Sequence, residues 1–251
     1  MNRAPTIEYI YGLNPAFEVL RAGRRTVTAA LINQASLAQP RMQKLVALLK
    51  ERKITIHHGE KGRLIDAARS GEHQGVVLEA TSYPYSSLEE VSKLQRVVLL
   101  DNIEDPHNVG AILRSAEVFG FTGILVPNKG TPEIYPSVVK TSAGASEFLH
   151  ICRDNSSVNY AKRLLDNGFN LIALDMHGKI TLDEVTGLEG KKLCLVIGGE
   201  DLAIGRFIIN AAQHVVSMRQ YGKVNSLNAS VAAAIALHHI ALRFPQAPAT
   251  S

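Results

Sequence analysis

Three separate segments of the sequence carry side chains that can bind a ligand or take part in acid–base chemistry. The first runs from Asn102 to Arg114, the second is Gly198-Gly199-Glu200, and the third runs from Asn225 to Ser230. Asparagine and serine supply donors and acceptors, arginine supplies a fixed positive charge, and paired glycines let a ligand approach the backbone. The sequence therefore offers three candidate pieces of one site.

The three segments follow predicted strands. The strands cover Val97–Asp101, Leu193–Ile197 and His214–Met218, and each is apolar and rich in β-branched residues. Parallel strands end at the same edge of their sheet, and ligands bind beyond that edge. We therefore expect the segments to meet there, with Asn108 or His107 capping the helix that follows the first strand.

Each segment also has a simpler interpretation when it is considered alone. The first is compatible with an acidic solvent loop and a surface arginine, and the second with an ordinary turn. In the third, an Asn or Ser helix cap would explain one residue. It would not explain Asn225, Ser226, Asn228 and Ser230 together.

Strand and helix patterns alternate along the chain, which predicts an α/β fold with a mostly parallel sheet covered on both faces. From residue 96 onward, further strands are predicted over Gly123–Pro127 and Asn170–Asp175, and helices over Asn108–Phe119, Ser157–Asn167, Ala203–Ala212 and Leu227–Arg243. Before residue 82, strands are predicted over Thr26–Ile32, Ile54–His57 and Gly75–Thr81, and helices over Met42–Lys53 and Gly62–Ser70.

The turn-rich segment Ser82–Ser87 separates the two parts and predicts a domain boundary. We expect an N-terminal domain over residues 1–82, a linker and first helix over 83–95, a second domain over 96–244, and a frayed tail over 245–251. Truncation of residues 1–85 is predicted to leave the second domain soluble.

Composition excludes several classes of protein. An apolar fraction of 46% with 20% charged residues excludes disorder along the whole chain. Only two cysteines occur, which excludes a disulfide scaffold; Cys152 and Cys194 stand in apolar runs and are predicted to be buried free thiols. No zinc-ligand spacing, signal peptide or membrane-spanning run is found, so we expect a cytoplasmic protein without a metal.

The positive charge is concentrated in the first third of the chain. Residues 1–85 hold 12 Lys and Arg against 7 Asp and Glu, whereas residues 86–251 hold 15 against 16. A local excess of this kind indicates a surface that faces nucleic acid, although a solvated surface with spare lysines is the plainer alternative.

Taken in order, the three segments resemble the SpoU (TrmH-type) family of RNA ribose 2′-O-methyltransferases, in its rRNA-modifying branch. Asn108-Val109-Gly110 with Arg114 resembles the first motif, Gly198-Gly199-Glu200 the second, and the stretch 226–232 the third. The resemblance covers about residues 96–243. A weaker one over residues 8–80 resembles the small N-terminal RNA-recognition domain of that branch.

The resemblance implies a SPOUT-type catalytic domain with a trefoil knot, S-adenosylmethionine as the methyl donor, no metal, and a homodimer formed through the knotted domain. It implies ribosomal RNA as the partner, most specifically a guanosine of 23S rRNA. A tRNA 2′-O-methyltransferase and a catalytically weak RNA-binding or ribosome-assembly member of the fold are the alternatives. The lack of GxGxxG weighs against a dehydrogenase.

By resemblance, Arg114 binds the nucleotide phosphate and stabilises the developing alkoxide, because a guanidinium is a poor base. Asn108 and Asn228 orient Arg114 or the ribose, and Glu200 anchors Arg114 or an RNA group. The proton leaves through a phosphate oxygen, Ser226, water or Arg114. His107 is a weaker candidate for the base.

The resemblance also implies residues that hold the donor and the RNA. The expected walls of the donor pocket are Ile197, Gly198, Gly199, Met218 and Leu227. The expected RNA contacts in the basic N-terminal third are Arg21, Arg24, Arg25, Lys44 and Arg52. Ala203 and Arg219 depart from the usual glycine and proline of the family, and both are expected near the donor pocket.

Overall fold

The computed structural model describes residues 6–199, 202–223 and 226–245, and these form two compact units. The first unit combines the chain up to Pro84 with a later segment, Ile134–Glu147. The second unit holds Tyr85–Glu133 and the chain from Phe148 onward. Residues 134–147 were predicted to belong to the second domain, and they lie in the first unit instead. Of the predicted tail over 245–251, residues 246–251 lie outside the described residues.

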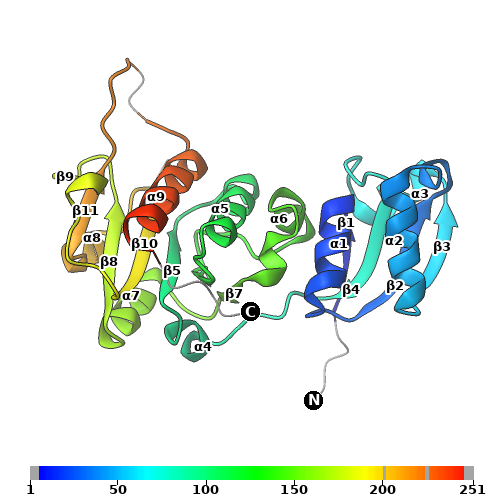
Figure 1. Cartoon of the computed structure of the whole chain (residues 1–251), viewed down its shortest axis with the longest axis horizontal. Coiled ribbons are helices and arrows are strands. Elements are labelled where there is room, and N and C mark those ends of the chain that lie inside the picture. Colours follow the sequence, from blue (N-terminus) through cyan, green and yellow to red (C-terminus); the bar gives the residue numbers. More distant parts are fainter. Residues whose placement is uncertain (1–5, 200–201, 224–225, 246–251) are drawn as a thin grey trace. The chain divides into compact units, whose positions relative to one another are not determined.

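The first unit is built on a four-stranded mixed sheet with the order β1-β4-β2-β3, in which only β2 and β3 are parallel (Figure 1). Its strands are β1 (Ile7–Tyr11), β2 (Val27–Asn33), β3 (Thr55–Gly59) and β4 (Val76–Thr81). Its helices are α1 (Leu13–Ala22), α2 (Pro40–Glu51), α3 (Lys61–Ala68) and, from the later segment, α6 (Pro136–Thr141).

Local sequence explains the boundaries of α1 and α2. Gly23 ends α1 in the left-handed conformation at φ +63°, which glycine adopts without strain. Pro40 begins α2, where its fixed φ fits and its missing N–H has no partner to lose. The buried faces of these helices include Val19, Leu45 and Leu49, whose spacing follows the helical repeat.

The second unit contains a seven-stranded sheet with the order β7-β6-β5-β10-β8-β11-β9, and every pairing in it is parallel. The strands are β5 (Arg96–Asp101), β6 (Gly123–Leu125), β7 (His150–Cys152), β8 (Phe169–Leu174), β9 (Ile180–Thr181), β10 (Lys192–Gly198) and β11 (His214–Ser217). The α/β class with a parallel sheet and a small N-terminal unit is confirmed. The trefoil knot stays a prediction.

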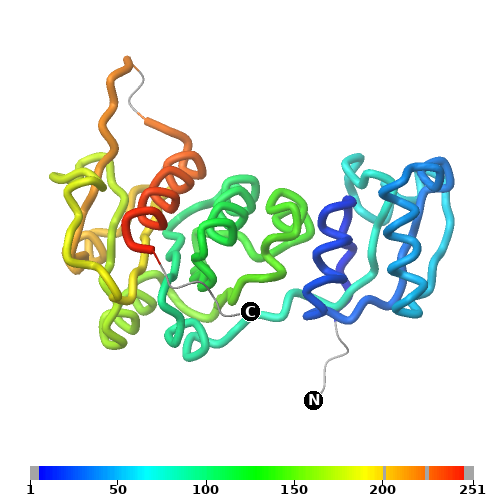
Figure 2. The backbone as a smooth tube through the Cα atoms, in the orientation of Figure 1, coloured from blue at the N-terminus to red at the C-terminus, as the bar shows by residue number. Residues whose placement is uncertain are grey.

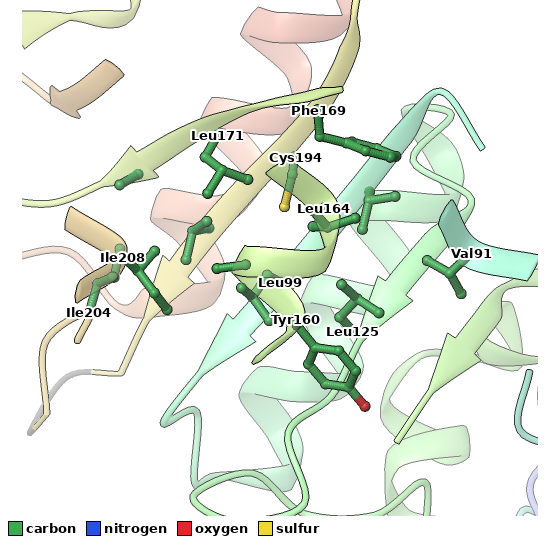
Figure 3. Packing of buried hydrophobic residues seen from close by; sticks show 14 of the residues in the cluster. Val91, Leu99, Leu125, Tyr160, Leu164, Phe169, Leu171, Cys194, Ile204 and Ile208 are labelled. Carbon is green, nitrogen blue, oxygen red and sulfur yellow. The ribbon is translucent and has the colours of Figure 1, made fainter. Parts of the chain in front are cut away.

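Helices cover both faces of this sheet. They are α4 (Leu88–Ser92), α5 (Pro106–Val118), α7 (Ser157–Asp166), α8 (Arg206–Ala211) and α9 (Ala229–Arg243). Figure 3 shows one core, in which Leu99, Leu171 and Cys194 from three neighbouring strands pack with Tyr160 and Leu164 of α7. On the opposite face, α9 packs against α5 and β10 (Figure 2).

Both cysteines are free and buried, as predicted. Burial raises the pKa of the Cys152 thiol to about 11, which keeps it protonated at neutral pH. Among the described residues, no helix is long and apolar enough to cross a membrane.

The strand order places a topological switch between β5 and β10. From β5 the chain adds β6 and β7 on one side, whereas β8, β11 and β9 lie on the far side of β10. Ligands bind at such a switch, beyond the carboxyl ends of the two central strands. The ends of β5 and β10 are Asp101 and Gly198, next to two of the three candidate segments.

Candidate active site

Asp101 holds the loop that follows β10 against the end of β5. Its buried carboxylate accepts a hydrogen bond from Ser157 Oγ at 2.6 Å and another from the Gly205 backbone N–H at 2.8 Å. Its carbonyl oxygen accepts the Gly199 N–H at 3.0 Å. The bonds to Gly199 and Gly205 position the chain before and after residues 200–201, and the bond to Ser157 ties Asp101 to α7, so Asp101 shapes the edge of the site.

Two glycines let this loop approach its neighbours. A Cβ added to Gly199 would overlap the carbonyl oxygen of Asn102, and one added to Gly198 would lie 2.9 Å from Ile204. Asn102 itself has φ +60°, a left-handed conformation that asparagine tolerates better than most residues. The predicted glycine pair is therefore required by the close approach of the loops after β5 and β10.

All five residues predicted for the donor pocket line a single cavity of about 200 Å³. Ser226, predicted as a candidate proton acceptor, lines the same cavity. The other lining residues are Leu174, Asp175, Met176, Ala203, Ile204, Gln220, Ala229 and Ala232. The cavity thus collects the ends of β8, β10 and β11 and the start of α9.

A second hollow of about 130 Å³ shares Gly199 and Ala229 with this cavity. Its remaining walls come from the first segment and from the loop after β10: Asn102, Ile103, Glu104, Asp105, Asn108 and Leu202. The first and second candidate segments therefore meet beside the larger cavity, as their positions after neighbouring strands predicted.

A hydrogen bond joins the first and third segments. Asn228 Nδ2 donates to Asn108 Oδ1 at 2.9 Å, across 120 positions of sequence. Asn228 Oδ1 in turn accepts from the N–H and hydroxyl of Ser230 and from the Val231 N–H, which caps α9. Asn228 therefore caps α9 through its oxygen and contacts Asn108 through its nitrogen, and its predicted role in orienting Arg114 or the ribose stays a prediction.

Asn108 does not cap α5, contrary to the sequence prediction. The helix begins at Pro106, and the Asp105 carboxylate caps it by accepting the His107 backbone N–H at 2.9 Å. Asn108 therefore lies in the first helical turn, and its side chain reaches Asn228. His107 is exposed and lines neither hollow.

Two predicted catalytic residues that the structure describes, Arg114 and Asn228, line neither hollow. Arg114 is exposed on α5, six residues after Asn108 and so about 9 Å further along the helix axis. Glu200 lies outside the described residues, so its prediction is not placed.

Comparisons with known proteins agree on one family. A sequence model of the SpoU rRNA Methylase family matches residues 95–238. A second model, described as RNA 2′-O ribose methyltransferase substrate binding, matches residues 9–86. The chain belongs to the SpoU rRNA methylase family.

Similarity to known relatives and to a solved structure extends over nearly the whole chain. An uncharacterized tRNA/rRNA methyltransferase of Mycolicibacterium gilvum is 32% identical over 241 residues, covering 93% of this chain and 76% of the relative. YacO of Bacillus subtilis, named as a putative TrmH family tRNA/rRNA methyltransferase, is 29% identical over 241 residues. The match covers 93% of this chain and 94% of YacO.

The crystal structure of an AdoMet-bound rRNA methyltransferase from Sinorhizobium meliloti shares the fold, with a TM-score of 0.79 at 20% identity. The superposed part covers 96% of this chain and 88% of that one. Together, the family matches identify an RNA 2′-O ribose methyltransferase of the SpoU family. We call the first compact unit the substrate-binding unit and the second the methylase unit, after the models that match most of each.

The two departures from the SpoU pattern have different positions. Ala203 lines the 200 Å³ cavity, as expected. Arg219 is exposed and is not part of the lining, although its neighbours Met218 and Gln220 are. Arg219 therefore lies beside the cavity lining without being part of it, and its effect on the donor pocket stays a prediction.

One of the predicted RNA contacts, Arg25, is buried inside the substrate-binding unit. Its guanidinium binds both oxygens of Glu147 at 3.0 Å and Glu8 at 2.6 Å. Burial raises the pKa of the Glu147 carboxyl, and the Arg25 charge opposes that shift. A buried, fully paired guanidinium cannot reach an RNA phosphate, so the prediction for Arg25 is wrong.

The other predicted RNA contacts differ in accessibility. Arg24 is half-buried and donates to the Pro84 carbonyl oxygen at 2.9 Å. Arg21 is exposed but is paired with Glu18 at 2.9 Å. Lys44 and Arg52 are exposed at α2.

In the described part of the chain, no group of three His, Cys, Asp or Glu side chains is arranged to hold a metal.

Proposed function

We propose that this chain transfers a methyl group from S-adenosylmethionine to the 2′-hydroxyl of a ribosomal RNA nucleotide in the cytoplasm. The 23S rRNA is the favoured substrate, and guanosine is the favoured nucleotide. The observation that carries the proposal is the Asn108–Asn228 hydrogen bond beside the cavity lined by Gly198, Gly199 and Leu227. The bond joins the first and third motif segments, and the cavity lining adds the two glycines of the second.

The cavity fits the donor by its chemistry. Ile197, Met218 and Leu227 offer apolar surface for a planar base, and Gly198 and Gly199 leave the backbone accessible for hydrogen bonds. Asp175 stands in the same lining and can accept hydrogen bonds from hydroxyl groups. The donor supplies an electrophilic methyl group on a positively charged sulfur.

The chain must hold the RNA 2′-oxygen in line with that methyl group and deal with its proton. In the reaction the oxygen–carbon bond forms, the carbon–sulfur bond breaks, and the hydroxyl proton leaves. Arg114 lines neither hollow, so its proposed role, binding a phosphate and stabilising negative charge on the oxygen, rests on the SpoU motif to which it belongs. Asn108 orients the ribose, and Asn228 fixes Asn108 through their hydrogen bond. Ser226, at the cavity wall, is a candidate to relay the proton.

A radiolabelled methyl-transfer assay tests the proposal. The donor is offered with ribosomal RNA and tRNA purified from a strain that lacks this protein. Methylation of a 2′-oxygen removes the nucleophile of alkaline cleavage, so the modified position appears as a gap in an alkaline ladder. We expect label and a gap in 23S rRNA. Label in tRNA alone would reassign the substrate, and no label in either RNA would refute catalysis.

The proposal includes a homodimer formed through the methylase unit. Val231, Ile235 and Leu242 are 47%, 47% and 69% exposed, and their spacing places them on one face of α9. Val118 of the neighbouring α5 is 65% exposed. A second copy would cover this apolar face. Light scattering should report a dimer for the wild type and a monomer for Ile235→Asp; a wild-type monomer would refute the dimer.

A further inference from the structure

One face of the sheet in the substrate-binding unit is only partly covered. Side chains alternate along each strand, so Ile10 and Leu78 face α1 and α2 and are buried. Tyr11 and Val77 face the other side, where Leu64 of the short helix α3 packs on them. α3 therefore covers only one end of this face.

The next row of side chains lies beyond α3. Tyr9 on β1 pairs with Glu79 on β4, which pairs with Ala29 on β2. This row and the Tyr11 row share a face, because residues two apart on a strand point the same way. The row forms the floor of a hollow of about 810 Å³, which we name the open-face hollow. Its walls include His57, Arg63, Asp66 and Arg69, together with Tyr135–Ser137 from the later segment.

The open-face hollow concentrates exposed apolar surface. In the described part of this unit, four large apolar side chains are exposed: Ile7, Tyr9, Ile65 and Tyr135. All except Ile65 line the hollow, at 38%, 43% and 48% exposed respectively. Clustered exposed aromatic groups mark binding sites more often than isolated ones. The hollow also falls within the usual size of small-ligand pockets, about 300–1,000 Å³.

The polar groups of the hollow fit a nucleobase better than a bare phosphate backbone. Arg63 and Arg69 carry two positive charges, and Asp66 and Glu79 carry two negative charges. The Glu8 carboxylate is directed to Arg25 instead. A balanced set of charges attracts a run of phosphates less than an all-basic groove does, although each arginine can still bind one phosphate. Carboxylates can accept hydrogen bonds from base amino groups, and tyrosine rings can stack on base faces.

We propose that the open-face hollow binds unpaired nucleotides of the RNA substrate, with Tyr9 and Tyr135 stacking on the bases. The identity of the ligand as RNA rests on the proposed function, and the substrate-binding family match over residues 9–86 covers most of the hollow. Bases inside a duplex show their edges but not their faces, so a stacking site selects single-stranded or looped RNA. The Arg63 and Arg69 guanidinium groups bind the flanking phosphates.

Tyrosine variants of the full-length protein test the stacking. Fluorescence anisotropy is measured with a mixed-sequence single-stranded RNA and with the duplex that it forms with its complement. We expect Tyr9→Leu and Tyr135→Leu each to weaken single-strand binding about 5- to 150-fold, the range for loss of one stacked base. Duplex binding should be unchanged. The Phe variants, which keep the ring, should bind as the wild type does.

Ile65→Ala is the matched control, because Ile65 is 37% exposed in the same unit but lies outside the hollow. Salt dependence separates the two kinds of contact. Arg63→Gln with Arg69→Gln should reduce the slope of log K against log salt by about 1.4, which is about 0.7 per phosphate contact. The tyrosine variants should leave that slope unchanged.

The inference is overturned if both Leu variants bind single-stranded RNA with the affinity of the unmodified protein. It is also overturned if the unmodified protein does not bind single-stranded RNA. Donor affinity is measured in parallel, to show that the methylase unit is intact in each variant. The outcomes for the two proposals are distinct. A wild type that methylates RNA while its tyrosine variants bind normally refutes the hollow alone, whereas stacking-dependent binding without methylation refutes the proposed reaction alone.

Discussion

Asp101 offers the sharpest test of how the fold builds the donor pocket. Its carboxylate is buried at the end of β5, and both of its oxygens are used, one by the Ser157 hydroxyl and one by the Gly205 N–H. Gly205 follows the loop that contains Ala203 and Ile204 of the cavity wall. Replacing Asp101 by Ala therefore releases one wall of the cavity without touching the donor.

The size of the effect follows from the two bonds. A hydrogen bond to a charged group contributes about 1.5–3 kcal/mol, and the half-buried Gly205 N–H loses this partner in Asp101→Ala. We expect a loss of about 3–5 kcal/mol in the free energy of unfolding of this unit. If the loop then populates its binding-competent form about a tenth of the time, the apparent Kd for the donor rises about tenfold.

Urea unfolding and calorimetric titration with S-adenosylhomocysteine measure the two effects separately. Ser157→Ala is the matched control, because it removes one bond to Asp101 and leaves the bond to Gly205. It should lower stability by about 1.5–3 kcal/mol, the value of one such bond, and change the donor Kd little. If Asp101→Ala loses stability but binds the donor with wild-type Kd, the idea that Asp101 positions the cavity wall is refuted.

Three further variants test the site and the substrate-binding unit. Arg114→Ala should keep donor affinity and lose turnover by orders of magnitude in the methyl-transfer assay; near wild-type turnover would refute the role of Arg114. Asn228→Ala should lose turnover and, by removing the α9 cap, about 1 kcal/mol in urea unfolding; activity restored by cooling would leave Asn228 as a cap alone. Arg25→Met should cost about 3–5 kcal/mol because the buried Glu147 loses its partner, and adding Glu147→Leu should restore most of it; equal losses in both variants would contradict the pairing.

Long elements and the order of the segments were accessible from sequence. Buried parallel strands such as β5 and β10 are continuous apolar runs, so their positions and the loops after them could be predicted. The short strands β7 and β9, with three and two residues, carry no periodicity that would reveal them. The site was found because the motif segments follow the long strands.

Other parts of the site depend on which strands are neighbours. Asp175 and Met176 line the cavity because β8 pairs with β10, and no local signal in the sequence states that pairing. The cap of α5 was accessible and was missed: Asp105-Pro106 is a strong helix-start signal, since Asp favours the cap position and Pro the first turn. The prediction placed the cap at Asn108 or His107 instead of Asp105.

The burial of Arg25 shows why net charge alone overestimates an RNA surface. Its partner Glu147 stands 122 positions away, in a segment that sequence analysis placed in the other domain. Five predicted contacts were counted as equivalent charges. Arg25 is neutralised inside the unit, Arg24 is half-buried, and Arg21 is paired with Glu18 at the surface.

The same contacts change how RNA docking should be tested. Truncating residues 1–85 removes Arg25 and leaves the Glu147 carboxylate, now 1% exposed, without its partner. It also removes Tyr83, whose hydroxyl donates to the Ser146 carbonyl oxygen at 2.8 Å. We therefore expect the truncated protein to aggregate, for a reason unrelated to RNA.

Charge reversal in the full-length chain is the cleaner experiment. Lys44→Glu with Arg52→Glu changes two exposed side chains at α2, so the fold should keep its melting temperature. If these residues contact phosphates, RNA affinity falls and the salt slope decreases by about 1.4–1.8, since each lost phosphate contact accounts for about 0.7 in single strands and 0.9 in duplexes. An unchanged slope would move phosphate recognition away from α2, because both positions remain accessible in the folded unit.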